Sequence, residues 1–299
     1  MTSPDRPGPH RRSRAAARAP GLPGTRHGVH PPHDPDTGPA PHRLLPGAED
    51  SPVLLHVPHS SRAVPPEVRR ELLLDDAALA AELDLMTDAH TAELAALATA
   101  LAPHTPWRFV NGLSRLVVDP ERFPDDREEM TAVGMGAVYT RTAHRAPLRP
   151  DGFDPAPLLG RYFHPYAEAM TAAVQDRLDA TGRAVVLDVH SYPSRVLPYE
   201  LPPATPRPPV CLGTDAFHTP PALLAHARAA FGEAPTSGLD TPFAGAYVPL
   251  RFHGTDARVT ALMLELRRDT YLTEPAGPTH AGLTTLAKSL ADLVDRVSG

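Results

Sequence analysis

The sequence is poor in several residue types, and each scarcity excludes a class of structure. Cys211 is the single cysteine among 299 residues, so no internal disulfide can form and a tetrathiolate zinc site is excluded. This usage favours a reducing compartment, and we expect a cytoplasmic protein. No run approaches the roughly 18 uninterrupted apolar residues of a membrane-spanning helix, so we expect no contact with a membrane.

Positive charge is also in short supply. The formal net charge is -6 at pH 7 and the sequence pI is near 6.2, without the basic excess that binding to phosphate backbones requires. Nucleic acid is therefore not an expected partner. Lysine occurs once, at Lys288, and isoleucine does not occur, whereas arginine, alanine and proline are abundant. Because of this bias, the number of arginines alone carries no functional argument.

The first 45 or so residues contain almost no large apolar side chains and are dense in proline, glycine, arginine and histidine. Such a segment buries too little apolar surface to offset the entropy lost on ordering. Residues 1–48 are therefore predicted to be a disordered tail, and residues 49–299 a single folded domain. The stretch "RRSRAAAR" in the tail is similar to part of an export signal, but no apolar segment follows it, so export is not expected.

From Ser51 onward, short apolar runs alternate with stretches of helical periodicity. Buried strands are predicted at "PVLLHVPHSS", "AVVLDVHS" and "VTALMLELRR", and a strand or hairpin at "WRFVNGLSRLVVD". Helices are predicted over residues 65–101 (one or two helices), 155–182 (ended by Gly182), 220–232 and 279–299. Strands that alternate with helices predict an α/β fold with a mixed, mostly parallel sheet flanked by helices on both faces.

Two of the predicted strands end in the same way. "LLHVPHSS" ends in His59 and "VVLDVHSY" in His190, each followed by a serine just past a continuous apolar run. In open α/β sheets, ligands bind in the crevice beyond the carboxyl ends of the strands, and neutral imidazole is a common zinc ligand. The pair predicts a metal site, although a structural histidine at either strand end would give the same local pattern.

A third ligand is expected in "AELDLMTDAHTAEL", which offers Asp84, Asp88, His90 and Glu93. His90 and Glu93 are three residues apart and would share one face of a helix. Such a pair arises easily by chance, however, because the helices of this chain carry many scattered charges. On spacing alone the choice among these four residues stays open.

Glu265 stands alone among apolar residues in "VTALMLELRR". A buried carboxylate is costly unless it is paired, bound to metal or held with a raised pKa, whereas a glutamate on an edge strand could simply face solvent. We interpret Glu265 as a general base beside a metal-bound water, whose pKa zinc lowers toward about 7.

Arginines and serines offer further candidates. "NGLSRLVVDPERFPDD" supplies Arg115 and Arg122, and an arginine fork is a natural receptor for a substrate carboxylate. Solvated surface arginines are the alternative in so arginine-rich a chain. Ser60 and Ser191 would suit a nucleophile mechanism, but neither lies in the glycine-flanked elbow of serine hydrolases.

The order of several short motifs is more specific than any one of them. Between about residues 50 and 275 the chain contains "VPHSS", "TDAH", "SRLVVDPER", "AVYTRTAHRAPL", "FHPYAEAM", "VLDVHS", "FAGAYVPLRFHG" and "MLELRRDTYL". In this set it resembles the N-formylglutamate amidohydrolase family. The resemblance implies a fold of the zinc carboxypeptidase type over residues 49–299. It also implies conversion of N-formyl-L-glutamate and water to formate and L-glutamate, late in histidine breakdown.

The resemblance further implies roles for individual residues at the metal. It places one zinc ion on His59, Asp88 and His190, with the fourth position open for water, and it makes Glu265 the base. It thereby favours Asp88 as the third ligand. Asp188 lies two residues before His190 on the same side of the strand and is a candidate for fixing its tautomer, although a strand-end aspartate could equally cap a turn.

Substrate-binding roles follow in the same way. The resemblance implies that Arg115 and Arg122 orient substrate carboxylates, and His253 in "LRFHG" is a further candidate. Arg195, close after the second histidine motif, is a candidate for stabilising the oxyanion. At residues 119–122 this chain has Asp-Pro-Glu-Arg where the family commonly has Asp-Leu-Asn-Arg, which puts the identity of the substrate in question.

The expected partner is therefore a small-molecule N-acyl amino acid, with zinc as cofactor. A zinc peptidase, or a deacylase for another N-acyl amino acid, is the alternative from the same chemistry. A non-catalytic binding protein on the same fold is the alternative from another class. The sequence does not determine the acyl group or the amino acid of the substrate, or the oligomeric state of the protein.

Overall fold

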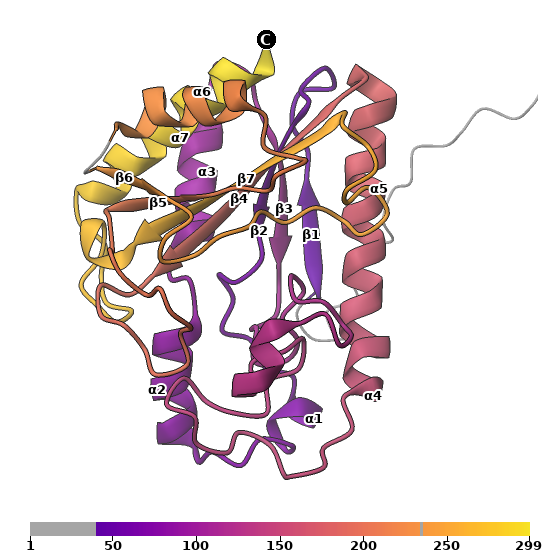
Figure 1. The fold of residues 1–299 in the computed structure, drawn as a ribbon, viewed down its shortest axis with the longest axis vertical. Coiled ribbons are helices and arrows are strands. Elements are labelled where there is room, and N and C mark those ends of the chain that lie inside the picture. Colours follow the sequence, from indigo (N-terminus) through magenta and orange to yellow (C-terminus); the bar gives the residue numbers. More distant parts are fainter. Residues whose placement is uncertain (1–39, 234–235) are drawn as a thin grey trace, which may run out of the picture. The chain divides into compact units, whose positions relative to one another are not determined.

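Seven strands form one mixed sheet in the computed structural model, which describes residues 40–233 and 236–299 (Figure 1). The strands are β1 (His42–Leu45), β2 (Val53–Val57), β3 (Trp107–Asn111), β4 (Ala184–Tyr192), β5 (Val210–Gly213), β6 (Ser237–Leu239) and β7 (Val259–Arg267). Their order in the sheet is β1-β3-β2-β4-β7-β5-β6. Only the β1–β3 and β5–β7 pairs are antiparallel, so the predicted mixed, mostly parallel α/β sheet is confirmed.

Helices cover both faces of this sheet, as predicted. They are α1 (Pro66–Arg69), α2 (Asp76–Met86), α3 (Thr91–Leu101), α4 (Ala156–Leu158), α5 (His164–Thr181), α6 (Pro221–Phe231) and α7 (Gly282–Ser298). Helices α3, α6 and α7 lie on one side of the strands in Figure 1, and α5 lies on the other. Gly182 takes the left-handed conformation at the end of α5, where a residue without Cβ adopts it at no steric cost.

The alternation of side chains along the strands separates two hydrophobic cores. Val53, Leu55 and Val57 of β2 pack into the larger core, which also takes in α3, α6 and α7. Leu54 packs on the opposite face, in a core shared with α5. Because side chains alternate along a strand, the intervening residue His56 lies on the α5 face. The same alternation holds in β4 and β7, and it decides on which face their polar residues lie.

Some predicted boundaries differ from the observed ones. β1 lies inside residues 1–48, which were predicted to be a disordered tail, so the folded part begins earlier than predicted. Its four residues gain their stability by pairing with β3, which local composition does not reveal. The prediction that residues 1–39 are disordered lies outside the described residues.

Residues 65–101 form three helices rather than one or two. Asp75 begins the second of these helices by accepting a hydrogen bond from the backbone N–H of Ala78 at 2.8 Å. The predicted strand or hairpin after Trp107 is a strand of five residues followed by turns. Among the described residues, no helix is both long and apolar enough to cross a membrane.

Candidate metal centre

The central strands of the sheet present their polar side chains on the α5 face. In the parallel pairing of β4 with β7, His190 lies opposite Glu265, and in the pairing of β2 with β4, His56 lies opposite Asp188. Side chains two residues apart on a strand share a face, so Asp188 and His190 lie on the same side. Glu265 is buried in an interior strand, and the reading of it as a solvent-facing edge residue is excluded.

Three of the predicted ligands converge on one point. His59 Nδ1 lies 3.2 Å from His190 Nδ1, and Asp88 Oδ2 lies 3.1 Å from the latter and 3.7 Å from the former. All three residues are at most 3% exposed. His59 follows the end of β2, and Asp88 lies in the break between α2 and α3, where its backbone N–H donates to the carbonyl of His59 at 3.0 Å. That backbone contact brings the carboxylate beside the two rings.

Each imidazole has a buried carboxylate at its other ring nitrogen. His59 Nε2 lies 2.9 Å from Asp119 Oδ1. His190 Nε2 lies 3.0 Å from Asp188 Oδ2, although without good hydrogen-bond alignment. Carboxylates in these positions orient metal-binding histidines and fix their tautomers. Asp188 thus lies where the sequence suggested, and Asp119 is its counterpart at the other ring.

The donor set fits a divalent metal ion. Two ring nitrogens 3.2 Å apart can share at most one proton between them, and with a carboxylate oxygen they form the kind of two-nitrogen, one-oxygen set that zinc accepts in catalytic sites. His59, Asp88 and His190 offer ligand atoms that all lie within 4.8 Å of one another. The chain therefore has the residues that would hold such an ion.

Burial and neighbouring charges set the ionisation of the acids at this centre. Burial alone would raise the pKa of Asp88, but hydrogen bonds from His190 and His59 outweigh it and hold that pKa far below the usual range. Burial raises the pKa of Glu265 to about 7, and the negative charge of Asp88 adds to the effect while His190 opposes it. Glu265 Oε2 is buried without a hydrogen-bond partner. A carboxylate near neutral pKa with a free oxygen can both accept and release a proton.

Arg115 and Arg122 converge on a single carboxylate, that of Asp119. Arg115 donates from Nη2 to Asp119 Oδ2 at 2.8 Å and from Nε to the hydroxyl of Tyr139 at 2.9 Å, and its Nη1 lies 3.9 Å from Asp88 Oδ1. Arg122 Nε lies 3.5 Å from Asp119 Oδ2. Arg115 thus reaches toward the converging ligands, while Asp119 compensates part of the charge of both guanidinium groups.

Arg268 is a buried residue that the sequence reasoning did not single out as a site residue. It is 2% exposed, and its Nη2 lies 3.4 Å from Asp88 Oδ1. Its Nε donates to Ser191 Oγ at 3.2 Å and its Nη1 to the carbonyl of Leu85 at 2.7 Å. Arg268 therefore ties β4 to the end of α2 and balances the charge of Asp88. Its position directly after β7, at the carboxyl end of a central strand, could have marked Arg268 as a site residue in the sequence.

Several sequence candidates lie elsewhere. Asp84 pairs with Arg62 at 2.6 Å, with both side chains well exposed. His90 pairs with Glu93 at 3.0 Å in the first turn of α3, where the Glu93 side chain is exposed. Neither arrangement brings a group to the converging ligands, because the chain turns between α2 and α3. Asp88 is thus the member of its segment that the structure places with His59 and His190.

Arg195 also lies away from the site. It is exposed and does not line the cavity described below, because the chain turns outward after β4. Arg115 is the arginine that the fold holds near the ligands instead. Ser191 Oγ accepts a hydrogen bond from Arg268, which gives it a structural partner rather than a base.

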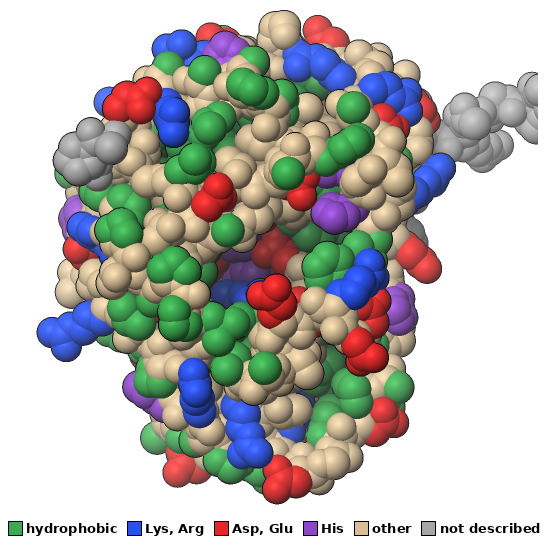
Figure 2. Space-filling view, viewed as in Figure 1, with side chains coloured by type: hydrophobic (Ala, Val, Ile, Leu, Met, Phe, Trp, Pro, Cys, Tyr) green, Lys and Arg blue, Asp and Glu red, His purple; other side chains and the backbone are tan. Residues whose placement is uncertain are grey.

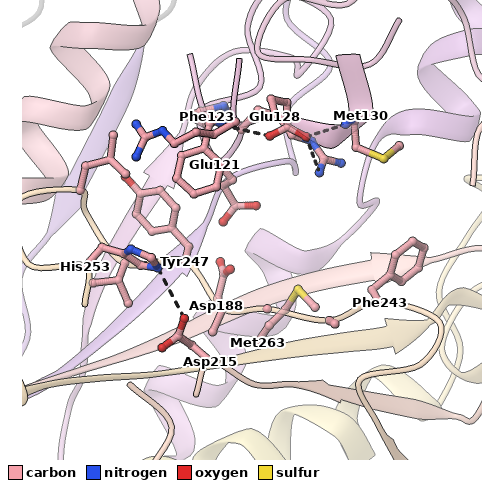
Figure 3. A pocket seen from close by; sticks show the side chains of 18 of the residues that line it. Glu121, Phe123, Glu128, Met130, Asp188, Asp215, Phe243, Tyr247, His253 and Met263 are labelled. Atoms are coloured by element: carbon pink, nitrogen blue, oxygen red, sulfur yellow. Dashed lines mark hydrogen bonds and ion pairs between the residues drawn. The ribbon is translucent and has the colours of Figure 1, made fainter. Parts of the chain in front are cut away.

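A cavity of about 1190 Å³ adjoins the metal centre. On the face shown in Figure 2 the surface is hollowed, and acidic, histidine and basic side chains are visible at the bottom of the hollow. The cavity is lined by Asp188 and Glu121 next to the histidines of the metal centre, and by His253, which lies 3.5 Å from Asp215 Oδ2 (Figure 3). Arg122 also lines it. Arg122 and His253 therefore have access to a ligand in this space.

Glu121 stands where the family commonly has asparagine, within residues 119–122. In the structure its carboxylate lies among three histidine rings. Its Oε2 lies 3.2 Å from His190 Nε2 and 3.7 Å from His59 Nε2, and its Oε1 lies 3.3 Å from His56 Nδ1. His56 itself is fully buried and was not predicted as a site residue. The carboxylate of Glu121 therefore borders both the metal centre and the cavity.

Comparison with known proteins bears on both fold and family. The family model for N-formylglutamate amidohydrolase matches residues 51–272. The crystal structure of N-formylglutamate amidohydrolase from Ralstonia eutropha JMP134 is similar in fold, with a TM-score of 0.72 and 23% sequence identity, covering 87% of this chain and 97% of that one. A gene product of Agrobacterium tumefaciens superimposes with a TM-score of 0.61 and 18% identity, over 85% of this chain and 92% of that one. Among curated proteins, no sequence match was found.

Proposed function

This chain belongs to the N-formylglutamate amidohydrolase family, and we propose that it hydrolyses the amide bond of an N-acyl amino acid with the help of one bound zinc ion. The observation that carries the proposal is the convergence of His59, Asp88 and His190 beside Glu265. N-formyl-L-glutamate is the first substrate to test, because the family is named for it.

His59, Asp88 and His190 would hold the metal, oriented from behind by Asp119 and Asp188. When bound at such a site, zinc lowers the pKa of a water molecule and polarises the acyl carbonyl. Two imidazoles and one carboxylate favour zinc over magnesium or calcium, which prefer sites made only of oxygen ligands.

Glu265 moves the proton in this proposal. Its carboxylate accepts a proton from the attacking water and returns it to the nitrogen of the departing amine. Burial supports this role, because it raises the pKa of Glu265 to about 7, and general bases work best with a pKa near the operating pH. The unpartnered Oε2 supports it too, since that oxygen is free to receive a proton.

Arg115 and Arg122 orient the substrate. Arg115 Nη1 lies 3.9 Å from Asp88 Oδ1, close enough to the ligands to favour negative charge that develops on the acyl oxygen. Arg122 lines the cavity and its side chain is 28% exposed, so part of its guanidinium group is accessible to a substrate carboxylate. His253 would contact the far end of a longer substrate.

We also propose that residues 49–299 form the catalytic domain. The reaction would take place in the cytoplasm. With N-formyl-L-glutamate as substrate, the step would fall late in histidine breakdown. The single cysteine suits a reducing compartment.

Metal analysis combined with an activity assay tests the proposal. The purified protein should contain close to one equivalent of zinc, and it should release formate or another acid from an N-acyl amino acid. A chelator should abolish that release, and added zinc should restore it. Protein that holds zinc but cleaves none of a panel of N-formyl and N-acetyl amino acids would support the binding-protein alternative instead.

A further inference from the structure

The cavity beside the metal centre carries an excess of negative charge. Nine of the residues that line it are acidic and three are arginines. Two of these arginines already face carboxylates. Arg127 donates two hydrogen bonds to Asp125 at 2.8 and 2.7 Å, and Arg122 lies 3.5 Å from Asp119 and 3.7 Å from Glu128. Two of the three arginines are therefore partly compensated. Among the acids, Glu200 pairs with Arg207 at 2.6 Å, but the acidic side chains still outnumber the arginines.

Glu121 and Asp188 are the two acidic side chains of this wall that lie against His190 of the metal centre, at 3.2 and 3.0 Å. In Figure 3 the carboxylates of Glu121 and Asp188 project into the space between the labelled residues. Glu121 Oε2 lies 3.2 Å from His190 Nε2, and 15% of the Glu121 side chain stays exposed where it lines the cavity. A partly buried carboxylate that still faces a cavity favours a ligand that brings a charged hydrogen-bond donor.

His56 does not neutralise this pair of acids. Its Nδ1 lies 2.9 Å from Asp188 Oδ1 and 3.3 Å from Glu121 Oε1. Burial would lower the pKa of His56, but the two carboxylates outweigh it and raise that pKa to about 9. One imidazolium between two carboxylates compensates only one of their two negative charges.

The remaining wall here is apolar or aromatic. Tyr247, Met263 and Phe123 line the cavity around the two carboxylates (Figure 3). A hydrocarbon stem could pack against these side chains while a cationic head reaches Glu121, as the side chain of lysine does at many protein surfaces. A second carboxylate in this place would instead lose hydration next to like charge.

We propose that the cavity selects an N-acyl amino acid whose amino-acid side chain carries a cationic amino group, and that Glu121 binds this group. The inference rests on the proposed hydrolysis and names its substrate class. Glu121 is then the residue that determines specificity, while Arg122 beside it remains available for the α-carboxylate. The preferred substrate is a basic amino-acid derivative rather than N-formyl-L-glutamate.

Three substrates that differ in side-chain charge test the inference on the zinc-loaded enzyme. Nα-formyl-L-lysine supplies the ammonium, Nα-formyl-L-norleucine the same stem without charge, and N-formyl-L-glutamate the opposite charge. We expect kcat/KM for the lysine derivative to exceed that for the norleucine derivative by at least about 10-fold, as for a charged hydrogen bond. Glu121→Gln should abolish this preference, and the control Glu93→Gln, at a position that does not line the cavity, should retain it. A wild-type enzyme that prefers the glutamate derivative, or a Glu121→Gln enzyme that still prefers lysine, overturns the inference.

Binding measurements separate this inference from the proposed reaction. Calorimetric titration of the same three compounds into the zinc-loaded protein requires no turnover. If no compound is hydrolysed but the lysine derivative binds most tightly and loses this advantage in Glu121→Gln, the reaction is refuted and the selectivity stands. If hydrolysis occurs but the lysine and norleucine derivatives bind equally, the selectivity is refuted and the reaction stands.

Discussion

His190 of β4 and Glu265 of β7 lie opposite each other in the parallel pairing of their strands. Both side chains therefore point to the same face of the sheet at neighbouring positions. The pairing of two hydrophobic strands thus holds a proposed metal ligand beside a carboxylate whose pKa burial raises to about 7. This relationship is the basis of the first prediction below.

Replacing Glu265 by glutamine should lower kcat by at least about 100-fold, because general bases typically contribute that much or more. The zinc content should stay near that of the wild type, since Glu265 is not among the three converging ligands. Steady-state kinetics and metal analysis of the same preparation check both points. Glu93→Gln, a matched change at an exposed side chain of α3, should leave both values unchanged. Full activity in Glu265→Gln would remove this residue from the mechanism.

Replacing Asp88 by asparagine should reduce zinc binding to well below one equivalent. The substitution keeps the shape of the side chain but removes the charge that lies 3.1 Å from His190 Nδ1. Asp84→Asn is the control, because Asp84 pairs with Arg62 on the surface. Plasma mass spectrometry after gel filtration gives the stoichiometry. Loss of zinc from Asp84→Asn with retention in Asp88→Asn would reverse the assignment.

Replacing Asp188 by asparagine should weaken zinc binding by about 10- to 100-fold without abolishing it, the usual effect of losing a carboxylate behind a ligating histidine. Asp188 lies 3.0 Å from His190 Nε2 and 2.9 Å from His56 Nδ1, so its loss frees both rings. Competition with a chromogenic chelator measures the affinity. Unchanged affinity would mean that Asp188 only serves to stabilise the fold.

Replacing Glu82 by glutamine should raise the free energy of unfolding more at pH 7 than at pH 4. Burial raises the pKa of Glu82, while the hydrogen bond from the Ala143 N–H opposes the shift. As the pH rises, the unfolded chain releases this proton before the folded chain does, so the wild type loses stability over that range. Glutamine titrates in neither state and can still accept the bond from Ala143.

Thermal unfolding of the wild type and Glu82→Gln from pH 4 to 7 measures this effect. The difference in Tm between the two proteins should increase in favour of the variant as the pH rises. Glu129→Gln, at an exposed position, controls for the substitution itself. A difference that stays constant or shrinks over this range would contradict the raised pKa.

Local sequence patterns predicted the main strands and their ends. β2, β4 and β7 are apolar runs, and the histidines at or just past the ends of β2 and β4 could be read directly from them. The shorter β1, β5 and β6 were not predicted. They have three or four residues each, too few to show a period, and they depend on neighbouring strands for their hydrogen bonds.

The third ligand shows where spacing alone was insufficient. The sequence pattern offered four equal candidates: Asp84, Asp88, His90 and Glu93. The family resemblance favoured Asp88. The structure supplies a physical reason, because α2 ends at Met86 and the backbone N–H of Asp88 then donates to the carbonyl of His59. That contact joins residues almost thirty positions apart, and no helical period encodes it.

By itself, the sequence determined the α/β class, the two histidines at strand ends and the isolated Glu265, because each depends on a local alternation of apolar and polar residues. Tertiary structure alone decided that Arg115 lies near the ligands while Arg195 is exposed, and that Glu121 lies among three histidine rings. Those placements depend on the register of the sheet and on loops that bring distant segments together. Neither can be predicted from local sequence patterns.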